Sequence, residues 1–400
     1  MPSSPPRVAY FPDSFHEING VAHTSREFEA FIRRHQLPFL CIRAGARHPR
    51  LLTEGRLTTL ELPRGILSFG LEKDLSFDVG LVRHMPAIAR AMRSFQPDLV
   101  HITGPSDLGM IGAIMANHYH LPLVASWHTN VHEYAAKRSG WFLNRLPQAL
   151  APAAARKIEN ASLFASALFY SAARVLFAPN RDLCALLEKA TGRPCLLMPR
   201  GVDTEAFSPA YRDREAGDTD FVLGFVGRLS VEKNIALLVR IREELLAAGL
   251  SNFRFLIVGH GAEERWLREH LPNAELPGVL RGADLARAYA NMDIFVFPSH
   301  TDTFGNVVLE ALSSGVPAIV TPDGGPKYII REGETGFVAD DEQFSAAILN
   351  VLRNPQLHAR MRAAALADAL STSWDSVFER VYAGYDLALS TPDAQAQSGS

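Results

Sequence analysis

Short apolar runs alternate with longer amphipathic stretches along almost the whole chain, and this alternation constrains the fold more than any other feature. Strands that alternate with helices of this length predict parallel sheets built from right-handed crossover units. The predicted strands are Val8–Phe11, Phe39–Arg43, Leu99–Thr103, Leu123–Ser126, Val175–Ala178, Val222–Val226, Phe253–Val258, Ile294–Phe297 and Ala318–Val320. The predicted helices are His23–Arg34, Val82–Phe95, Asn234–Ala248, Ala262–His270, Leu285–Ala290, Asn306–Ser313 and Glu342–Leu352. The fold class is therefore α/β.

The pattern restarts near residue 220, after an irregular stretch rich in proline, glycine and charge. Such a stretch suits a linker, and 400 residues exceed one ordinary domain. We therefore expect a Rossmann-like N-terminal domain over residues 1–205 and a second one over residues 206–373. The amphipathic helix at residues 374–389 is expected to pack back on the first domain, and residues 390–400 to form a disordered tail. Two such sheets would face each other across a cleft.

Composition excludes several classes of protein. Hydrophobic residues make up 47% and charged residues 21% of the chain, so it is not a disordered protein. Its three cysteines, Cys41, Cys184 and Cys195, are too few and scattered for a disulfide framework, and we expect buried thiols in a reducing compartment. The start of the chain lacks a secretory pattern, and no apolar run approaches the roughly 18 residues of a spanning helix. A cytoplasmic location is expected.

The net charge of −3 hides an asymmetry between the two halves. Residues 1–200 carry a balance of +8, and the remainder carries −11. A basic half of this kind could attract an anionic membrane surface or an anionic substrate, which would place the protein at the inner membrane face. A solvated surface without a partner is the alternative. We expect no nucleic-acid partner.

In the first half, polar residues follow two predicted strands. Gly20 stands before a helix, where its backbone could approach an anion. The strand Leu123–Ser126 runs into a segment that carries His128, followed by His132, Glu133 and Tyr134. A histidine at the carboxyl end of a strand can hydrogen-bond sugar hydroxyls. His128 and His132 have the i, i+4 spacing of metal ligands, but the glutamate of an HExxH motif is missing.

In the second half, Arg228 and Lys233 flank a loop that directly follows a strand. Two fixed cations at a strand end could clamp a diphosphate, although they could also be surface charges without a role. The next strand leads into a Gly259-x-Gly261 turn, where Glu264 occupies the place of a third glycine. The dinucleotide-binding fingerprint therefore fails.

The segment after strand Ile294–Phe297 is the most informative one. Phe304, Gly305 and Asn306 would offer free backbone N–H groups at the start of a helix, which makes an anion site. Asp302 lies in the preceding loop, and Glu310 lies eight positions later among apolar neighbours. Both carboxylates could face one ligand, one nearer a sugar and the other nearer a ribose.

A possible metal motif has to be weighed. Asp218-Thr219-Asp220 has a D-x-D form, which can hold a divalent cation. It precedes a strand instead of following one, whereas hard cations need convergent oxygen ligands at a cleft. We expect no metal site.

Taken together, these segments resemble the family 4 glycosyltransferases of the GT-B fold, from residue 8 to about residue 388. The resemblance rests on the order and spacing of NGV at Asn19–Val21, WHTN at Trp127–Asn130, RGVD at Arg200–Asp203, GRLSVEKN at Gly227–Asn234, the Asp302/Glu310 pair and GGP at Gly324–Pro326. It implies a retaining glycosyltransferase, in which the departing phosphate takes the proton of the acceptor. It also implies that neither a metal nor another cofactor is needed, because Arg and Lys supply the positive charge.

The resemblance also implies roles for individual residues. His128, Arg228, Lys233 and Asp302 would be catalytic. The donor would be bound by Gly20, Gly259, Thr303, Phe304, Gly305, Asn306 and Glu310. The acceptor side would be formed by Asn19, His132, Glu133 and Tyr134. The expected donor is a nucleotide-sugar, with GDP-mannose as the first choice, and the expected acceptor is a lipid or a saccharide.

The chain departs from the family at one position. The family motif is Glu-x7-Glu, and Asp302 replaces its first glutamate. Aspartate is one methylene shorter, so its reach toward the sugar differs. A UDP-sugar donor, an epimerase or phosphorylase-like enzyme, and a non-catalytic nucleotide-sugar-binding protein are the alternatives.

Overall fold

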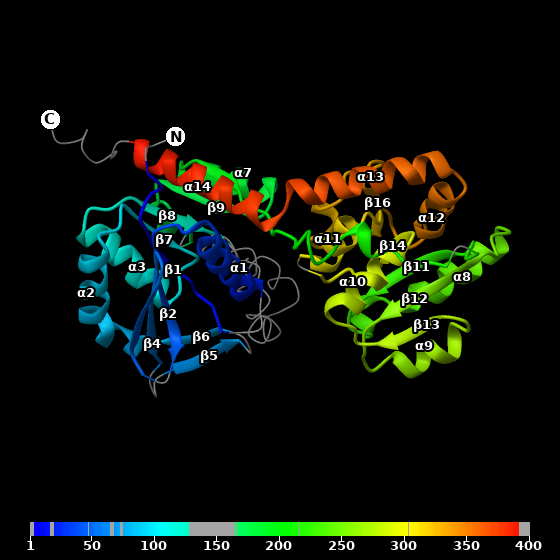
Figure 1. Ribbon diagram of the computed structural model, residues 1–400, viewed down its shortest axis with the longest axis horizontal. Helices are drawn as coiled ribbons and strands as arrows, with labels where there is room; N and C mark the ends of the chain where they lie inside the picture. The colour runs from blue at the N-terminus through cyan, green and yellow to red at the C-terminus, as the bar shows by residue number, and fades with distance from the viewer. Residues whose placement is uncertain are drawn as a thin grey trace, which may run out of the picture. The chain divides into compact units, whose positions relative to one another are not determined.

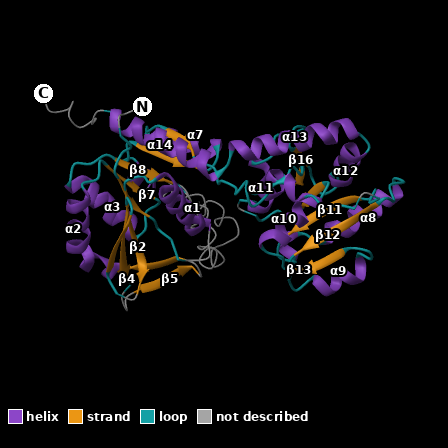
Figure 2. Cartoon of the chain, viewed as in Figure 1, coloured by secondary structure: helices purple, strands orange, loops and turns teal. Residues whose placement is uncertain are grey.

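The computed structural model describes residues 4–16, 20–46, 48–64, 68–72, 75–127, 164, 166–215, 217–302 and 304–391. The chain divides into two compact units (Figure 1). Unit 1 comprises residues 1–199 and 377–400, and unit 2 comprises residues 200–376. In each unit helices pack against a central sheet, as Figure 2 shows.

Unit 1 holds a sheet with the strand order β10-β9-β8-β7-β1-β2-β4-β3. Its strands are β1 (Val8–Phe11), β2 (Phe39–Ala46), β3 (Arg50–Glu54), β4 (Leu57–Pro63), β7 (Leu99–Ile102), β8 (Leu123–Ser126), β9 (Val175–Ala178) and β10 (Cys195–Leu197). A separate antiparallel pair is formed by β5 (Ser68–Glu72) and β6 (Leu75–Asp78). The helices are α1 (Gly20–His35), α2 (Met85–Phe95), α3 (Asp107–His118), α7 (Arg181–Thr191) and most of α14 (Trp374–Ser390).

Unit 2 holds a parallel sheet with the strand order β13-β12-β11-β14-β15-β16. Its strands are β11 (Phe221–Val226), β12 (Phe253–Val258), β13 (Glu275–Gly278), β14 (Ile294–Phe297), β15 (Ala318–Val320) and β16 (Gly336–Val338). The helices are α8 (Ala236–Ala247), α9 (Glu264–His270), α10 (Gly282–Asn291), α11 (Asn306–Ser313), α12 (Phe344–Leu352) and α13 (Pro355–Ser371). A 3-10 turn, η3 (Val231–Lys233), follows β11.

The α/β class and the parallel sheets predicted from the alternation are confirmed. Every residue of β1, β7, β8, β9 and β14 is buried, as expected for strands covered on both faces. The sheet of unit 1 is not purely parallel, because the edge strand β3 pairs antiparallel with β4. The sequence analysis missed β3 because four of its five residues are exposed, so it lacks an apolar run.

The predicted helix Val82–Phe95 begins later than expected. Residues Val79–His84 form a 3-10 turn, and α2 starts at Met85 with Pro86 in its first turn. Proline lacks a backbone N–H and fixes φ, so it suits the first turn of a helix and not its interior.

Helix α14 packs on unit 1 through aromatic contacts and one buried hydrogen bond. The ring of Phe378 stacks on that of Phe28 in α1, with 4.4 Å between centroids. The hydroxyl of Tyr385 lies 2.6 Å from Nδ1 of the buried His101 on β7. A helix more than 270 residues distant in sequence thus completes the core of unit 1.

The irregular stretch predicted as a linker belongs to unit 2, whose first residue is Arg200. Arg212 and Arg214 both bind Asp293 at the start of β14, with N–O distances of 2.8 and 2.6 Å. All three cysteines are free thiols, of which Cys41 and Cys195 are buried. Within the described residues, no helix is both long and apolar enough to span a bilayer.

Candidate functional site

Each unit has one point where the strand order reverses. In unit 1, β1 lies between β2 and β7. In unit 2, β11 has β12 on one side and β14 on the other. Open parallel sheets bind ligands outside the carboxyl ends of their strands at such a point. The loops after β1 and β7, and after β11 and β14, are therefore the places to look for a site.

The unit 2 reversal brings together two residues that the sequence singled out. Lys233 ends the turn after β11, Asp302 lies in the loop after β14, and Nζ of Lys233 donates to Oδ2 of Asp302. About a fifth of each side chain is exposed, so both groups remain accessible to a ligand. Nζ of Lys233 also lies 5.6 Å from the ring centroid of Phe297. The two charges are partly neutralised by each other.

Arg228 behaves differently from Lys233. Its side chain is 73% exposed, and its nearest acidic partner is Glu232, with 3.7 Å between Nη1 and Oε1. A surface ion pair of this kind contributes little to stability. The guanidinium is thus free to move toward a ligand.

The start of α11 has features that favour an anion. Gly305 is the N-cap residue with a φ of 87°, a left-handed conformation that favours glycine, and no side chain caps this end of the helix. The guanidinium of Arg200 lies over the ring of Phe304 at 4.2 Å and donates to Oδ1 of Asn306 at 3.3 Å. Uncapped N–H groups and a nearby cation both favour a negative ligand here.

Arg200 is a candidate that sequence reasoning missed. Burial lowers the pKa of its guanidinium to about 10, and the charge of Asp302 partly offsets that shift. Arg200 therefore stays charged at neutral pH in a partly desolvated place. Its signal was present in the sequence, because Arg200 opens the RGVD motif.

Glu310 lies on α11, where the hydroxyl of the buried Tyr289 donates to its Oε2 at 2.7 Å. Burial raises the pKa of the Glu310 carboxyl to about 7, and the hydrogen bond from Tyr289 partly opposes this shift. The Tyr289 bond holds one oxygen of this carboxyl in place. Perturbed carboxyls of this kind are concentrated at functional sites.

Gly259 has a structural reason to be glycine. Its φ is 142°, and a Cβ on it would lie 1.8 Å from the backbone oxygen of Gly227. Its N–H donates to the oxygen of Gly278 at 2.8 Å. The loops after β11 and β12 thus pass each other at a distance that only glycine permits. This packing explains Gly259 without a ligand.

The unit 1 reversal holds a group that the sequence analysis did not single out. Asp13 follows β1, and its backbone N–H donates to Oγ1 of Thr103, directly after β7, at 2.7 Å. Oγ of Ser106 donates to Oδ1 of Asp13 at 2.6 Å. A Cβ on Gly104 would lie 2.1 Å from Oδ2 of Asp13. The available signal was an acidic residue two places beyond a buried strand.

Burial raises the pKa of the Asp13 carboxyl to about 7, and the hydrogen bond from Ser106 opposes this shift. The charge of Asp107 adds to the increase. Asp107 itself forms an ion pair with Arg64 at 2.8 Å, so its carboxylate already has a partner within the protein. Asp13 is instead surrounded by hydroxyl donors, which suit the recognition of a polyhydroxyl ligand.

Several predicted site residues lie outside the described part of the chain. These are Asn19, His128, His132, Glu133, Tyr134 and Thr303. Gly20 is the first residue of α1, and β8 ends two residues before His128.

The DTD segment is engaged in ion pairs. Arg254 donates to both carboxylate oxygens of Asp218 at 2.9 and 2.7 Å, and Arg214 donates to Oδ2 at 3.0 Å. These bonds hold the pKa of Asp218 well below its usual range. The Asp218 carboxylate thus binds two guanidinium groups and supports the start of the sheet. In the described residues, no group of three or more potential metal-ligating side chains comes together.

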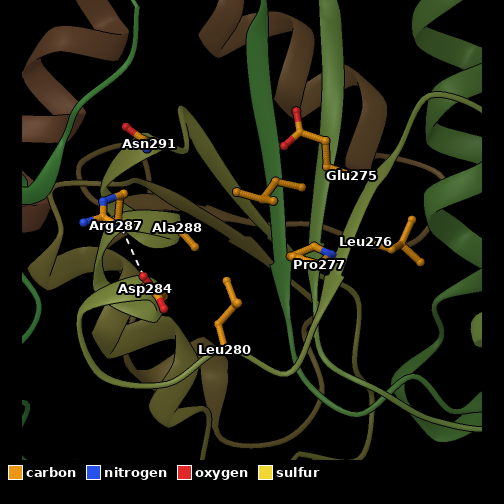
Figure 3. A pocket seen from close by; sticks show the side chains of 9 residues that line it. Glu275, Leu276, Pro277, Leu280, Asp284, Arg287, Ala288 and Asn291 are labelled. Carbon is orange, nitrogen blue, oxygen red and sulfur yellow. Dashed lines mark hydrogen bonds and ion pairs between the residues drawn. The ribbon is translucent and has the colours of Figure 1, made fainter.

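The open depression in Figure 3 is not this site. It has a volume of about 520 Å³ and lies between β12, β13 and α10 in unit 2. Arg287 on its rim is already paired with Asp284 at 3.1 Å and with Asp213 at 2.9 Å. None of the candidate residues lines it.

Comparisons with known proteins agree with this geometry. The family model described as Glycosyltransferase Family 4 matches residues 21–206, and that described as Glycosyl transferases group 1 matches residues 220–354. A GDP-mannose-dependent alpha-mannosyltransferase of Mycobacterium tuberculosis is 32% identical over 77% of this chain and 77% of its own length. The chain belongs to the family 4 glycosyltransferases. A protein of the same description from Corynebacterium glutamicum is 28% identical over 95% of this chain and 89% of its own.

The fold of this family 4 glycosyltransferase also matches solved structures. Sucrose-phosphate synthase from Thermosynechococcus elongatus superposes with a TM-score of 0.64 at 17% identity, covering 96% of this chain and 98% of its own. The GT-B architecture and the family predicted from the sequence are confirmed, and the chain is a glycosyltransferase. A nucleotide-sugar donor and a saccharide or lipid acceptor fit the relatives of this family.

Proposed function

We propose that this glycosyltransferase moves mannose from GDP-mannose to a hydroxyl group of a lipid or saccharide, with retention of the anomeric configuration. The observation that carries the proposal is the anion site around the start of α11, where Lys233, Arg200 and uncapped backbone N–H groups meet. The relatives described as GDP-mannose-dependent alpha-mannosyltransferases support the choice of donor.

In this proposal the positive groups stabilise the diphosphate as it leaves. Lys233 and Arg228 contact its oxygens, and the backbone N–H groups of Gly305 and Asn306 point toward the developing charge. Preorganised donors of this kind are commonly the largest contribution to catalysis. They need no metal, which agrees with the engagement of Asp218 by two arginines. The departing phosphate takes the proton of the acceptor hydroxyl.

The two carboxylates of unit 2 bind different parts of the donor. Glu310 accepts hydrogen bonds from the ribose hydroxyls, and Asp302 contacts the sugar with Thr303 beside it. The backbone of Gly259, whose lack of a side chain is already required by packing, lies beside the donor, and Phe304 packs beside the diphosphate. Lys233 exchanges part of its bond to Asp302 for the phosphate when the donor binds. None of these contacts identifies the nucleobase of the donor, so a UDP-sugar is the alternative donor.

The acceptor side of the reaction belongs to unit 1. Asp13, with Thr103 and Ser106 beside it, binds an acceptor hydroxyl at the reversal between β1 and β7. Asn19, Gly20, His132, Glu133 and Tyr134 complete the acceptor and phosphate contacts of this unit, and His128 contacts the transferred sugar. The basic balance of residues 1–200 brings the enzyme to an anionic membrane surface, where a lipid acceptor would be found.

The test is a donor screen on the purified protein. GDP-mannose, UDP-glucose and other UDP-sugars are first compared by thermal stabilisation, since a ligand that binds the folded state raises the melting temperature. Each stabilising donor is then incubated with lipid and saccharide acceptors, and the products are analysed by mass spectrometry and by NMR of the anomeric proton. Transfer from GDP-mannose to an α-linked product is expected. Transfer from UDP-sugars alone would replace the donor, and an inverted product would contradict retention. Activity is expected to persist in excess EDTA.

A further inference from the structure

A histidine that the sequence analysis left aside joins four of the strand-end loops in unit 2. His300 lies in the loop after β14, two residues before Asp302. Its Nδ1 is 2.8 Å from Oδ2 of Asp323, after β15, and its Nε2 is 3.0 Å from Oδ1 of Asp341, after β16. The second oxygen of Asp341 accepts from Nδ2 of Asn234, after η3, at 3.0 Å.

These contacts require a proton count that neutral histidine cannot supply. A neutral imidazole carries one N–H group, whereas donation to two carboxylates needs both nitrogens protonated. Burial acts to lower the pKa of His300, but the hydrogen bonds and charges of Asp323 and Asp341 outweigh it, so the pKa is raised. The imidazolium form therefore fits the observed geometry, and the neutral form fits only one half of it.

The cluster adjoins both members of the Lys233–Asp302 pair. Asn234 directly follows Lys233, and His300 is two residues from Asp302. Oγ1 of Thr301 donates to the backbone oxygen of Glu232, which adds a second link between the same loops. Arg240 of α8 donates to the backbone oxygen of Asp341 and holds the far end of the cluster. The loop positions of Lys233 and Asp302 thus depend on the bonds of His300.

We propose that His300 is a positioning residue whose protonated form holds the loops of Lys233 and Asp302 in register for the nucleotide-sugar, so that donor affinity falls as His300 loses its proton. The inference rests on the proposed donor site. When Nε2 is deprotonated, its lone pair faces the Asp341 carboxylate, while Nδ2 of Asn234 lies 3.3 Å away and can donate to it. The Nδ2 group of Asn234 then donates to His300 as well as to Asp341, and the link between the loops weakens.

The direction with pH follows from the raised pKa. His300 is fully protonated only well below its raised pKa in the folded protein, so its contribution to donor affinity is lost as pH rises through that pKa. Among the described residues, the charged groups in or next to the cluster include Asp323, Asp341, Lys233, Asp302, Arg240 and Glu232. Glu310, with its pKa raised to about 7, acts in the opposite direction, because its carboxylate improves ribose binding as pH rises.

The experiment measures the KM of the full-length enzyme for its nucleotide-sugar across roughly pH 5.5 to 9, a range that brackets histidine titration. The intact donor is used because its phosphodiester groups stay ionised throughout. The wild-type KM is expected to rise about five-fold above the His300 pKa, the order expected for one displaced hydrogen bond. His300→Arg keeps two donors and a permanent charge, so its KM should stay low. His300→Gln should show the high KM at every pH.

His270→Gln is the matched control, since His270 is exposed on α9 and bonds the backbone oxygen of Trp266. It should leave the profile unchanged. The pKa of His300 is read separately by NMR without any donor, and Asp341→Asn should lower it. An ordinary or reduced His300 pKa, or equal pH profiles in wild type, His300→Gln and His300→Arg, would overturn the inference. If no nucleotide-sugar binds at any pH, the proposed function fails, and the NMR titration still decides whether His300 is held as an imidazolium.

Discussion

The reversal points of the two units share a topology but differ in chemistry. Both place a carboxyl with a pKa raised to about 7 by burial beside the carboxyl ends of the strands, Asp13 in unit 1 and Glu310 in unit 2. Unit 2 adds cations in the loops before and around the start of α11, where Lys233 bonds Asp302 and Arg200 bonds Asn306. Around Asp13 the chain adds the hydroxyls of Thr103 and Ser106. The same scaffold thus carries groups that favour an anion in one unit and groups that favour hydroxyls in the other.

The largest effect should come from removing the unit 2 cations. Lys233→Ala and Arg228→Ala should each lower turnover by about 100-fold, because preorganised charge on a leaving group is typically worth a few kcal/mol. Circular dichroism and the melting temperature should show that the fold survives. Arg265→Ala is the control, since Arg265 is 92% exposed on α9 and pairs only with Glu269 among the described residues. Normal turnover in both variants would remove the cation clamp from unit 2.

The Lys233–Asp302 pair allows a sharper test of the same site. Asp302→Asn should lower transfer about ten-fold through the lost charge-assisted contact to the sugar. It also releases Lys233 from its carboxylate, so the free nucleoside diphosphate should bind as well as to wild type or more tightly. Calorimetric titration of the nucleoside diphosphate and of the intact donor separates these effects. Equal weakening of both ligands would show that Asp302 does not act on the sugar. Asp302→Glu restores the family's residue and should shift the donor preference.

The predictability of these features from sequence differs between the units. In unit 2, Lys233 and Asp302 lie at the ends of strands whose apolar runs are unambiguous, so topology alone was enough to bring them together. In unit 1, β3 lacks that signal because four of its five residues are exposed, and β5 and β6 lack it because each is only four or five residues long and mixes polar with apolar residues. Asp13 was missed because its significance depends on β7 lying beside β1, a neighbour about 90 residues away. His300 depends on four loops at once, which no local pattern encodes.

Glu310 should show opposite effects on stability and on binding. Glu310→Gln should weaken donor affinity about ten-fold, through loss of charge-assisted bonds to the ribose. Without ligand, wild type loses stability as pH rises from the ordinary glutamate pKa of 4.5 to about 7, because the folded protein must either retain a proton on Glu310 or bury its charge. The Glu310→Gln variant has no such loss, so its stability relative to wild type should increase over this pH range and stay higher above it. Urea denaturation of both proteins at pH values on either side of this window measures the difference. A stability difference independent of pH would contradict the raised pKa.

The hydroxyl site of unit 1 should affect the acceptor and spare the donor. Asp13→Asn keeps an oxygen that can accept from Ser106 but loses the carboxylate, so the KM for the acceptor should rise several-fold, as for one weakened hydrogen bond. Donor hydrolysis without acceptor should be unchanged. Asp98→Asn is a matched control in unit 1, where Asp98 bonds the backbone N–H of Arg7. A change in donor hydrolysis equal to the change in transfer would place Asp13 outside the acceptor site.

The smallest effect concerns the charge contrast between the two halves of the chain, +8 in residues 1–200 and −11 beyond. Several of these arginines are held in ion pairs, for example Arg43 with Glu29 and Glu61 at 2.7 Å each, so fewer remain to meet a membrane. Each well-placed exposed cation adds roughly 1 kcal/mol of attraction to an anionic surface, and salt screens it within a Debye length of about 10 Å. We therefore expect weak cosedimentation with vesicles that contain anionic lipid, loss of binding in high salt, and no binding to neutral vesicles.

Substituting the exposed arginines of α2, Arg90 and Arg93, with glutamine should reduce this binding while leaving transfer to a water-soluble acceptor intact, because neither residue lies at the β1–β7 reversal. Binding to neutral and anionic vesicles alike would point to an apolar contact instead, and the charge contrast would then carry no membrane role.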